Sequence, residues 1–424
     1  MKKNKEMRLV IFVLILFIFQ NIKGHELPLY KPETIPVKDE GNIRITFGSC
    51  NKYEENQQAN IFKTISKQHP DSFVWLGDIA YIDSYWIPYC FFWWVPEQDI
   101  ENMYRKFNST KNDVAYQQLL GTGTRILGIY DDHDYNNNDG GRLNPYKKVM
   151  QEMLFNFLDE PMESPRRKND ILFGSYYFGE NKKVKLILLD GRSEKHENSE
   201  VNAWDNLGEI QWQMLEEQLN DPNVELFIIA SGYVIIPDDK FIIENWFWPS
   251  KRKLLNILKK YKKRTIFLAG DIHYGEISDF SYCTQKQYGF PFIEVISSGL
   301  SFSEVDFPLI DYLRFIAVTD NFSKEEDRYY GNNFGQIDVQ IDENDIDNSI
   351  VNIQIYGFDN EKAKVSRKVF FKELNHNEDL IEPGFVCPIQ EGVIQVDQGI
   401  TKNHFSKTNY GKKSNLDKVI PKII

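Results

Sequence analysis

The stretch of sequence that decides the fold is GIYDDHDYNNNDGG, residues 128–141. It continues an apolar run over 125–130 that has the length and composition of a buried strand. The run stops without a spacer at the tetrapeptide DDHD, residues 131–134. Ligands bind at the carboxyl ends of strands in α/β proteins, so these four ionisable side chains are expected at the mouth of a site. For this stretch alone, a solvated acidic turn is the alternative.

Three other apolar runs end in the same way. They are IRITF (43–47) followed by GSCN, SFVWL (72–76) followed by GDIAY, and RTIFLA (264–269) followed by GDIH. A glycine at each turn lets the backbone pass close to a site, and the next side chain points into it. Crowded carboxylates repel one another unless a cation separates them, and oxygen with imidazole is a ligand set for hard or borderline metals. The four strand ends together therefore indicate a metal site.

The alternation of apolar runs with amphipathic segments from residue 43 to about 300 is typical of α/β layers. Helices are predicted over 57–67, 98–107, 145–158, 207–219 and 249–261. Strands are predicted over 43–47, 72–76, 125–130, 175–178, 184–189, 225–230, 264–269 and 292–297. Beyond residue 331 the hydrophobic period becomes two, which predicts antiparallel strands over 335–341, 350–356 and 366–371. Residues 376–424 are polar and are interpreted as a C-terminal tail.

Residues 1–24 are interpreted as a signal peptide of an exported protein. A basic start precedes the apolar run LVIFVLILFIF (9–19), which is too short to span a bilayer comfortably. An uncleaved anchor is the alternative, and membrane contact is expected only through this segment. The segment carries five basic residues and one acidic residue, so the net charge of the chain falls from −12 to −16 without it. A chain this acidic is not expected to bind nucleic acid by charge, and its oligomeric state is not indicated.

Export bears on the four cysteines, because an oxidising compartment normally pairs them. They are Cys50, Cys90, Cys283 and Cys387. Four cysteines allow three pairings, and the sequence does not choose among them. If Cys50 binds a metal, one of the other three cysteines has no partner for a disulfide. The pairing of Cys283 with Cys387 is favoured. The sequons at 108–110 and 321–323 fit an exported glycoprotein.

An aromatic window lies soon after Asp83, with six aromatic residues between Trp86 and Trp94. A dense aromatic group is usually part of a core. The alternatives are an aromatic wall of a substrate cleft and a contact with a membrane surface.

Seven motifs, all in order along the chain, resemble the PhoD-like metallophosphatases, which are alkaline phosphatase D relatives within the calcineurin-like metallophosphoesterase superfamily. They are FGSCN (47–51), WLGDIAYID (75–83), DDHD with NNNDGG (131–141), LLDGRS (188–193), LGEIQWQMLEEQL (207–219), GDIHYGEI (270–277) and SSGLSFS (297–303). The resemblance implies one PhoD-like domain over 25–375. It also implies a four-layer αββα sandwich, in which two mixed sheets pack face to face between helices, and a binuclear metal centre at the strand ends.

The resemblance assigns the metal ligands. Asp78, the acid of the first GD motif, would bridge the two ions, while Cys50 and Tyr81 would bind iron. The remaining ligands would be Asp132, Asp271 and His273. Thiolate and phenolate are donors that suit trivalent iron, and carboxylates suit calcium. Iron with calcium is therefore expected, with manganese or zinc as the alternatives.

The resemblance also assigns the chemistry. Two cations about 3.5 to 4 Å apart neutralise the charge of a phosphoryl group and turn bound water into hydroxide near neutral pH, so no protein nucleophile is required. Asp78 would fix the distance between the ions. The superfamily's Asn-His pair corresponds to Asp132 and His133 here, and His133 would contact the phosphoryl group or the leaving oxygen. Arg192 is predicted to be a phosphate clamp, with an ordinary salt bridge as the alternative. The chain lacks two motifs of the wider superfamily, Asp-x-His after the first strand and Gly-His-x-His after the late one. The PhoD-like branch lacks them too, so their absence changes the metals that are expected more than the fold.

The expected function is a secreted, metal-dependent hydrolase of phosphoric esters, a phosphodiesterase or alkaline phosphatase. The alternative is a non-catalytic secreted protein that keeps the fold and binds calcium or a partner. Because the motifs contain few cations beside the metals and an aromatic window lies nearby, diesters are expected to react faster than monoesters.

Overall fold

The computed structural model describes most of the chain between residues 30 and 403. The described residues are 30–39, 41–52, 61–86, 93–197, 204–236, 244–303, 305, 323–358, 362–387, 393–396 and 400–403. The predicted signal peptide, Cys90, the second sequon's asparagine and the side chains of the aromatic window between Trp86 and Trp94 lie outside what the structure describes. The architecture below is that of the part from Pro32 onward.

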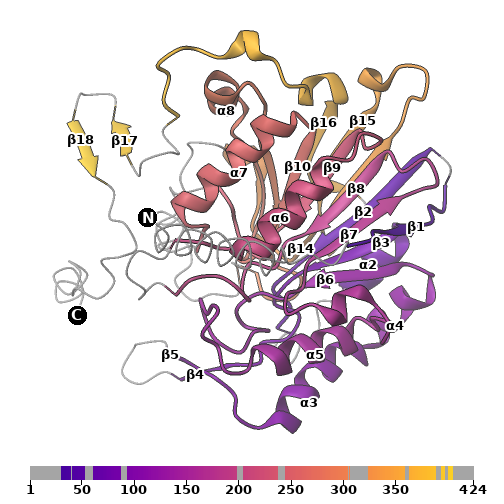
Figure 1. Ribbon diagram of the computed structural model, residues 1–424. Coiled ribbons are helices and arrows are strands. Elements are labelled where there is room, and N and C mark those ends of the chain that lie inside the picture. Colours follow the sequence, from indigo (N-terminus) through magenta and orange to yellow (C-terminus); the bar gives the residue numbers. More distant parts are fainter. Residues whose placement is uncertain are drawn as a thin grey trace, which may run out of the picture. The chain divides into compact units, whose positions relative to one another are not determined.

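The largest sheet has eight strands and is mixed (Figure 1). Its order is β1 (Glu33–Ile35), β7 (Gly174–Phe178), β8 (Val184–Leu188), β9 (Leu226–Ala230), β10 (Thr265–Ala269), β12 (Ile293–Ser297), β11 (Gly275–Asp279) and β13 (Arg328–Tyr329). Strands β8, β9, β10 and β12 are parallel, so their carboxyl ends reach the same edge. All residues of these four strands are buried, as expected for parallel strands covered on both faces.

The second sheet has six strands. Its order is β16 (Ala363–Phe370), β15 (Ile350–Gly357), β14 (Asn333–Gln340), β2 (Asn42–Gly48), β3 (Ser72–Leu76) and β6 (Arg125–Ile129). The strands β2, β3 and β6 are parallel, and β14 to β16 extend the sheet in antiparallel fashion. The two-residue period beyond residue 331 thus marks an antiparallel end of a sheet, as predicted.

Seven α-helices lie in the part of the chain that the structure describes. They are α2 (Ile61–Lys67), α3 (Ile100–Lys111), α4 (Val114–Gly121), α5 (Lys147–Phe157), α6 (Gly208–Leu219), α7 (Trp248–Tyr261) and α8 (Ser281–Tyr288). Asp99 and Asp113 cap α3 and α4 by accepting hydrogen bonds from backbone N–H groups of the first turn. Pro249 opens α7, where the missing N–H costs nothing.

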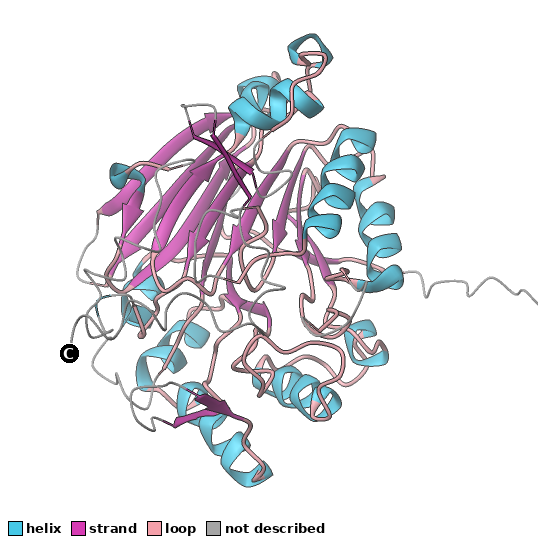
Figure 2. Ribbon diagram, turned by 90° about the vertical axis from the view of Figure 1, so that its left-hand side faces the viewer, coloured by secondary structure: helices cyan, strands magenta, loops and turns pink. Residues whose placement is uncertain are grey.

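The helices cover the outer faces of both sheets (Figures 1 and 2). On the six-stranded sheet, the buried Trp75 of β3 packs against Phe62 of α2, Tyr116 of α4 and Phe157 of α5. On the eight-stranded sheet, Gln218 of α6 accepts a hydrogen bond from Ser175 of β7. Helices α6 and α7 lie in front of β8 to β10 in Figure 1.

The inner faces of the two sheets pack directly on each other. A Cβ atom placed on Gly275 of β11 would lie 2.7 Å from Ile355 Cγ2 of β15, so the sheets approach closely at this glycine. One hydrophobic core contains buried residues from both sheets, among them Ile45, Ile228 and Ile353. The predicted four-layer αββα sandwich is confirmed.

The eight strands predicted before residue 300 are all present, each within one residue of its predicted ends. Outside the predicted tail, the prediction missed α4, α8 and the short strands β1, β4 (Ser84–Trp86), β5 (Trp93–Val95), β11 and β13. The eight residues of α8 include Thr284, Gln285 and Gln287, so the segment carries little helical apolar periodicity. Strand β11 follows the GDIH motif after one residue, and its pairing with β12 is a tertiary contact that local sequence does not reveal.

The first part of the predicted C-terminal tail, residues 376–387, is held against α8. The N–H groups of Asn377 and Glu382 donate to the carbonyls of Gly289 and Lys286, at 2.7 and 2.8 Å. Cys387 forms a disulfide with Cys283 of α8, so the favoured pairing is confirmed. Further along, β17 (Val393–Val396) and β18 (Ile400–Asn403) pair as an antiparallel hairpin.

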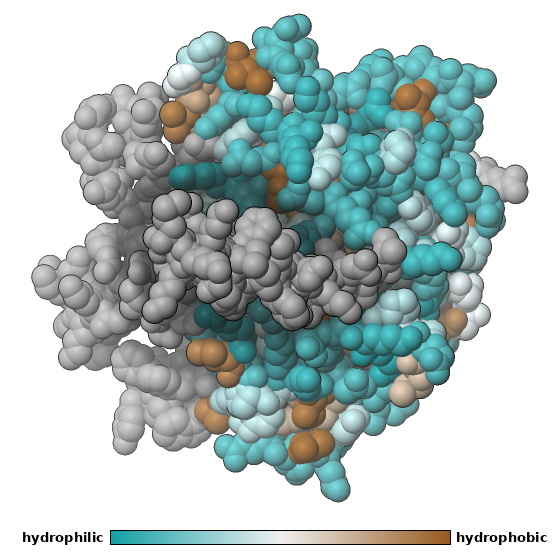
Figure 3. All heavy atoms as spheres, viewed as in Figure 1, coloured by the Kyte–Doolittle hydropathy of each residue, from teal (hydrophilic) through white to brown (hydrophobic). Residues whose placement is uncertain are grey.

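The surface seen in Figure 3 is mostly hydrophilic, with hydrophobic residues scattered over it. Exposed large apolar side chains occur on separate elements and loops, for example Val114, Leu143, Met162 and Tyr282. Within the described ranges, none of the helices has the length and hydrophobicity that crossing a membrane requires.

Candidate metal centre

The register of the strands brings the motif ends together. Gly48, Trp75 and Gly128 lie side by side across β2, β3 and β6, so the segments that follow emerge at one edge of the six-stranded sheet. In the other sheet, Ala269 lies opposite Ile296 near the ends of β10 and β12. The motifs after β2, β3, β6 and β10 therefore converge between the two sheets.

The turns at this edge have an unusual backbone conformation. Four of the predicted metal ligands have a positive φ angle: Cys50 at 58°, Asp78 at 51°, Asp271 at 76° and His273 at 61°. Non-glycine residues rarely adopt this left-handed region, and they keep it where the surrounding structure holds them in place. These four residues follow three strands, β2, β3 and β10, so the same local strain recurs at three strand ends.

Glycines at the same turns allow the close approach that the sequence predicted. A Cβ atom on Gly77, whose φ angle is +88°, would lie 2.3 Å from Asp131 Cβ. At Gly270 it would lie 2.5 Å from Ser49 Oγ. Any larger residue at either position would push apart the loops that carry the site.

Four carboxylates form the centre of the site. Asp78, Asp131, Asp132 and Asp271 each place one oxygen atom within 4.8 Å of the others. A second, three-residue ligand group consists of Asp78, Asp132 and His133, with ligand atoms within the same distance of one another. Two ligand groups that share Asp78 and Asp132 can hold two cations side by side, with shared carboxylates between them.

Two carboxylate oxygens in this cluster lack hydrogen-bond donors among the described residues. They are Oδ1 of Asp78 and Oδ2 of Asp131, and both residues are 1% exposed. A buried carboxylate oxygen without a donor is costly unless a cation binds it. The residues present therefore fit a pair of hard metal ions.

Electrostatics indicate the same need for positive charge. Burial raises the pKa of Asp78 well above its usual range, and the carboxylates of Asp132 and Asp131 raise it further, against the opposing effect of His133. Burial and the neighbouring Asp132 also raise the pKa of Asp271 well above its usual range. Cations at the centre would stabilise the ionised carboxylates and reverse these shifts.

Cys50 lies beside this carboxylate cluster. Its Sγ is 3.4 Å from Asp78 Oδ2 and 3.0 Å from Ser298 Oγ, and the side chain is fully buried. Burial and the charges of Asp78 and Asp271 raise the pKa of the thiol well above its usual value. A bound metal ion is the partner that would keep a thiolate at this position.

Tyr81, a predicted metal ligand, packs against His133, the predicted contact of the phosphoryl group. The two rings stack with centroids 4.3 Å apart. Burial raises the pKa of the Tyr81 phenol well above 10, and the Cys50 and Asp78 charges add to the effect. The predicted thiolate and phenolate donors thus both lie close to Asp78, where a trivalent ion would favour their ionised forms.

Both candidate histidines have one ring nitrogen held by a protein acceptor. His273 Nδ1 lies 3.0 Å from the Phe302 carbonyl oxygen, so Nε2 is the ring nitrogen that could bind a metal, but His273 belongs to none of the ligand groups among the described residues. His133 Nδ1 lies 2.9 Å from Oδ1 of Asp83, a buried carboxylate to which the sequence assigned no role. Asp271 and His273 are partly exposed, so the centre opens to solvent on their side.

Arg192 is fully buried in a network of ion pairs. Its Nε donates to Asp131 Oδ1 at 2.6 Å, and its Nη2 is 2.7 Å from Glu244 Oε2. The guanidinium also lies over the ring of Tyr233, with Cζ 4.3 Å from the ring centroid. Of the two roles that the sequence allowed, this arrangement favours the alternative, the salt bridge, because Arg192 orients Asp131 and has no exposed surface for a phosphate.

Four residues near the centre were not assigned by the sequence: Lys52, Asp83, Asp131 and Glu244. Lys52 directly follows FGSCN, Asp83 ends WLGDIAYID, and Asp131 opens DDHD, so their motifs carried a signal. Glu244 follows β9 by fourteen residues and belongs to no motif. Only the fold brings it to Arg192.

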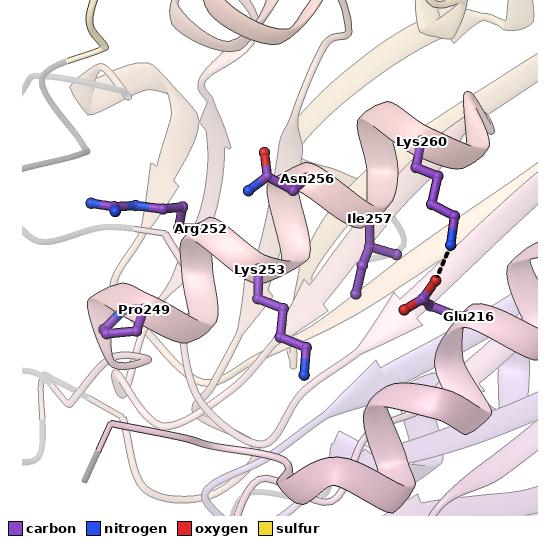
Figure 4. Close-up of a pocket in the computed structure, with 7 residues that line it drawn as sticks. All are labelled: Glu216, Pro249, Arg252, Lys253, Asn256, Ile257 and Lys260. Atoms are coloured by element: carbon purple, nitrogen blue, oxygen red, sulfur yellow. Dashed lines mark hydrogen bonds and ion pairs between the residues drawn. The ribbon is translucent and has the colours of Figure 1, made fainter. Parts of the chain in front are cut away.

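A separate concavity lies on the helical layer, away from the strand ends (Figure 4). It measures about 380 Å³ and is lined by residues of α6 and α7: Glu216, Pro249, Arg252, Lys253, Asn256, Ile257 and Lys260. In Figure 4, Glu216 and Lys260 reach across it to form an ion pair. The candidate metal groups of the described residues lie at the strand ends instead.

Comparisons with known proteins assign the chain to a family. The family model described as PhoD-like phosphatase matches residues 45–350. The chain belongs to the PhoD-like phosphatase family. This membership and the two ligand groups support a metal-dependent phosphatase.

Two solved structures resemble this PhoD-like chain. PhoD has a TM-score of 0.56 at 14% identity, over 83% of this chain and 74% of the other. A dimetal phosphatase from Danio rerio has a TM-score of 0.45 at 12% identity, over 78% of this chain and 99% of the other. At such identities the first likeness is evidence for the fold alone. Among curated proteins, no sequence matches.

Proposed function

We propose that this PhoD-like protein hydrolyses phosphoric esters at a binuclear metal centre formed by Cys50, Asp78, Tyr81, Asp132, Asp271 and His273. One observation carries the proposal: the carboxylates of Asp78, Asp131, Asp132 and Asp271 converge within ligand distance of one another, and buried oxygens of Asp78 and Asp131 lack donors in the described part of the chain. When bound, two cations neutralise the phosphoryl oxygens and supply a hydroxide nucleophile. Asp131, held by Arg192, is an additional ligand candidate.

We assign iron to the Cys50 and Tyr81 side of the centre and calcium to the carboxylate side. The support is the chemistry of the donors, because thiolate and phenolate stabilise a trivalent ion and carboxylate oxygens suit calcium. The alternative is manganese or zinc at the carboxylates. Total metal analysis of the purified protein distinguishes these assignments.

We assign to His133 the contact with the phosphoryl group or the leaving oxygen. Its Nδ1 is engaged by Asp83, so Nε2 is the atom that would donate a proton. The backbone N–H of His133 donates to Asp132 Oδ1 at 2.8 Å, which fixes the imidazole beside the ligand cluster.

Export from the cell belongs to the same proposal. It is supported by the basic and apolar start of the sequence and by the Cys283–Cys387 disulfide, since such bonds persist in oxidising compartments. Fractionation of the producing cells tests it: recovery of the intact chain, with residues 1–24 attached, in the cytosol would contradict export.

The test of the function is the variant Asp78→Asn, with Asp170→Asn as its matched control. Asp170 lies on the surface, with its side chain 78% exposed. We expect Asp78→Asn to lower turnover of 4-nitrophenyl phosphate and of its bis ester more than about a hundredfold while the protein stays folded, and Asp170→Asn to leave both rates unchanged. Tightly bound calcium with no turnover of either ester by the wild type would instead favour the non-catalytic binding protein.

A further inference from the structure

The hydroxyl of Ser298 contacts the sulfur of Cys50. Ser298 Oγ lies 3.0 Å from Cys50 Sγ, and both side chains are fully buried. Ser298 directly follows β12 of the eight-stranded sheet, and Cys50 follows β2 of the six-stranded sheet by two residues. The contact therefore joins the two sheets at the predicted metal centre. It is shorter than the contact of Ser49, whose Oγ lies 3.7 Å from the same sulfur.

The direction of this hydrogen bond follows from the second partner of Ser298. The backbone N–H of His273 donates to Ser298 Oγ at 2.8 Å, so the oxygen is the acceptor there. A hydroxyl has one proton to donate, and Cys50 Sγ is the acceptor that it contacts among the described residues. A metal-bound thiolate has no proton of its own and can only accept. Ser298 therefore donates to sulfur, and its hydroxyl connects the backbone of one predicted ligand with the side chain of another.

Backbone hydrogen bonds hold this hydroxyl beside the sulfur. Four consecutive N–H groups after Ser298 donate to the carbonyls of Ser49 and Cys50. They belong to Gly299, Leu300, Ser301 and Phe302, and the distances are 3.1, 2.9, 3.2 and 3.0 Å. The main chain thus fixes the position of Ser298 relative to Cys50, and the short serine side chain adds little freedom of its own.

A hydrogen-bond donor at this position changes the properties of a metal-bound sulfur. Cys50 Sγ also lies 3.4 Å from Oδ2 of Asp78, the carboxylate predicted to bridge the two ions. The positive end of the Ser298 hydroxyl dipole draws electron density from the thiolate, which would otherwise meet only the negative charge of this neighbour. Hydrogen bonds to a ligating sulfur tune the reduction potential of the ion, because they stabilise the more negative, reduced state.

We propose that Ser298 is a positioning residue of the metal centre, whose hydroxyl donates to Cys50 Sγ and sets the electron density on that sulfur. The inference rests on the proposed function, in which Cys50 binds iron, and it adds a residue that is not itself a ligand. Ser298 acts on the ion only through Cys50. The colour and the reduction potential of the bound iron therefore depend on Ser298, while the amount of bound iron does not.

The experiment compares wild type, Ser298→Ala, Ser298→Thr and the control Ser49→Ala, which removes a second fully buried hydroxyl near the same sulfur. Iron content, visible absorption and the ferrous-to-ferric ratio at one fixed electrode potential are measured on each purified protein. We expect Ser298→Ala to keep its iron and to absorb at longer wavelength, because sulfur holds its electrons less tightly. Its ferrous-to-ferric ratio should fall about threefold or more.

The other two variants isolate the hydroxyl of Ser298. Ser298→Thr keeps the donor and should retain the wild-type band, whereas Ser49→Ala should change the ratio less than about twofold, because its contact is longer. An unchanged band and ratio in Ser298→Ala at full iron content would overturn the assignment. Loss of iron from Ser298→Ala, or an equal change in Ser49→Ala, would overturn it too, since either result indicates a general disturbance of the site.

A measurement on the wild type covers the case in which Ser298→Ala does not fold. Resonance Raman spectra excited in the sulfur-to-iron band are recorded in H2O and in D2O. A hydroxyl that donates to Cys50 Sγ should shift the iron–sulfur stretching band on exchange of its proton. A band at the same frequency in both solvents would refute the hydrogen bond.

Failure of the proposed function gives a different result from failure of this inference. None of these measurements uses ester turnover, so an inactive protein that binds iron through Cys50 still tests Ser298. If the purified protein contains no iron, wild type and Ser298→Ala are loaded with cobalt(II), and its sulfur charge-transfer band is compared instead. A shift in Ser298→Ala supports the assignment. A wild type without a sulfur band with either metal overturns it, even if the protein hydrolyses phosphoric esters at its carboxylates.

Discussion

The Nδ1 atom of His133 lies 2.9 Å from Oδ1 of Asp83, and both side chains are buried. A carboxylate at this position fixes the orientation of the imidazole and favours its protonated form. Burial by itself would lower the pKa of His133, but the carboxylates of Asp132, Asp83 and Asp78 raise it well above its usual value. The pair is therefore suited to holding a proton beside the ligand cluster.

The first prediction concerns Asp83→Asn, which keeps the shape of the side chain and removes its charge. Losing this carboxylate lowers the pKa of His133. If protonated His133 donates to the leaving oxygen, activity is lost as pH rises through that pKa, so the basic limb of the kcat/KM profile should move to lower pH. We also expect kcat to fall about tenfold to a hundredfold. An unchanged pH profile with reduced activity would indicate that Asp83 is only structural.

The second prediction concerns Cys50→Ser. If Cys50 binds iron as a thiolate, the purified protein should be coloured by charge transfer from sulfur and from the Tyr81 phenolate. The substitution should bleach or shift the visible absorption band and reduce the iron content per chain. A colourless, active protein that contains only zinc or manganese would refute the iron assignment while leaving the phosphatase proposal intact.

The third prediction concerns Arg192→Met. Removing the guanidinium leaves Asp131 and Glu244 as buried carboxylates without their cation, so we expect about 3 to 5 kcal/mol of lost stability in urea unfolding of the metal-free protein. Lys148→Met is the control, because the exposed Lys148–Asp170 pair should contribute less than about 1 kcal/mol. Unchanged stability with weaker phosphate binding would support the clamp that the sequence predicted.

The fourth prediction concerns removal of the metals. Burial and neighbouring carboxylates raise the pKa values of Asp78 and Asp271 in the folded protein above those of the unfolded chain. In the metal-free protein these groups favour the protonated state, so their contribution to stability is greatest below the unfolded pKa, about 3.9, and decreases as pH rises through the raised values.

Thermal unfolding of chelated and metal-loaded protein between about pH 4 and pH 8 checks this prediction. The melting temperature of the chelated protein should fall as pH rises. Added metal should raise the melting temperature most at the high-pH end of this range, where the ligands are ionised. A chelated protein that becomes more stable with rising pH over this range would contradict the cation requirement of the cluster.

Much of the fold and part of the site could be predicted because their causes are local. A run such as SFVWL is long enough for one buried strand, and a glycine followed by an acid marks its end, so β3 and Asp78 were both found in the sequence. Reserving Cys50 for a metal left Cys90, Cys283 and Cys387, and no local feature of the sequence selects Cys283 with Cys387 among them. The sequence thus determined the α/β class, the positions of most strands and the acids, cysteine and histidines that end four of them.

Tertiary structure alone decided which of these side chains meet and what surrounds them. Arg192 and Asp131 are 61 residues apart, and Glu244 reaches the same guanidinium from a third segment. Lys52 lies over the ring of Phe302, 250 positions later in the chain. Such pairings depend on strand register, on positive φ angles at the turns and on the packing of one sheet against the other. These are properties of the assembled layers, so no short stretch of sequence encodes them.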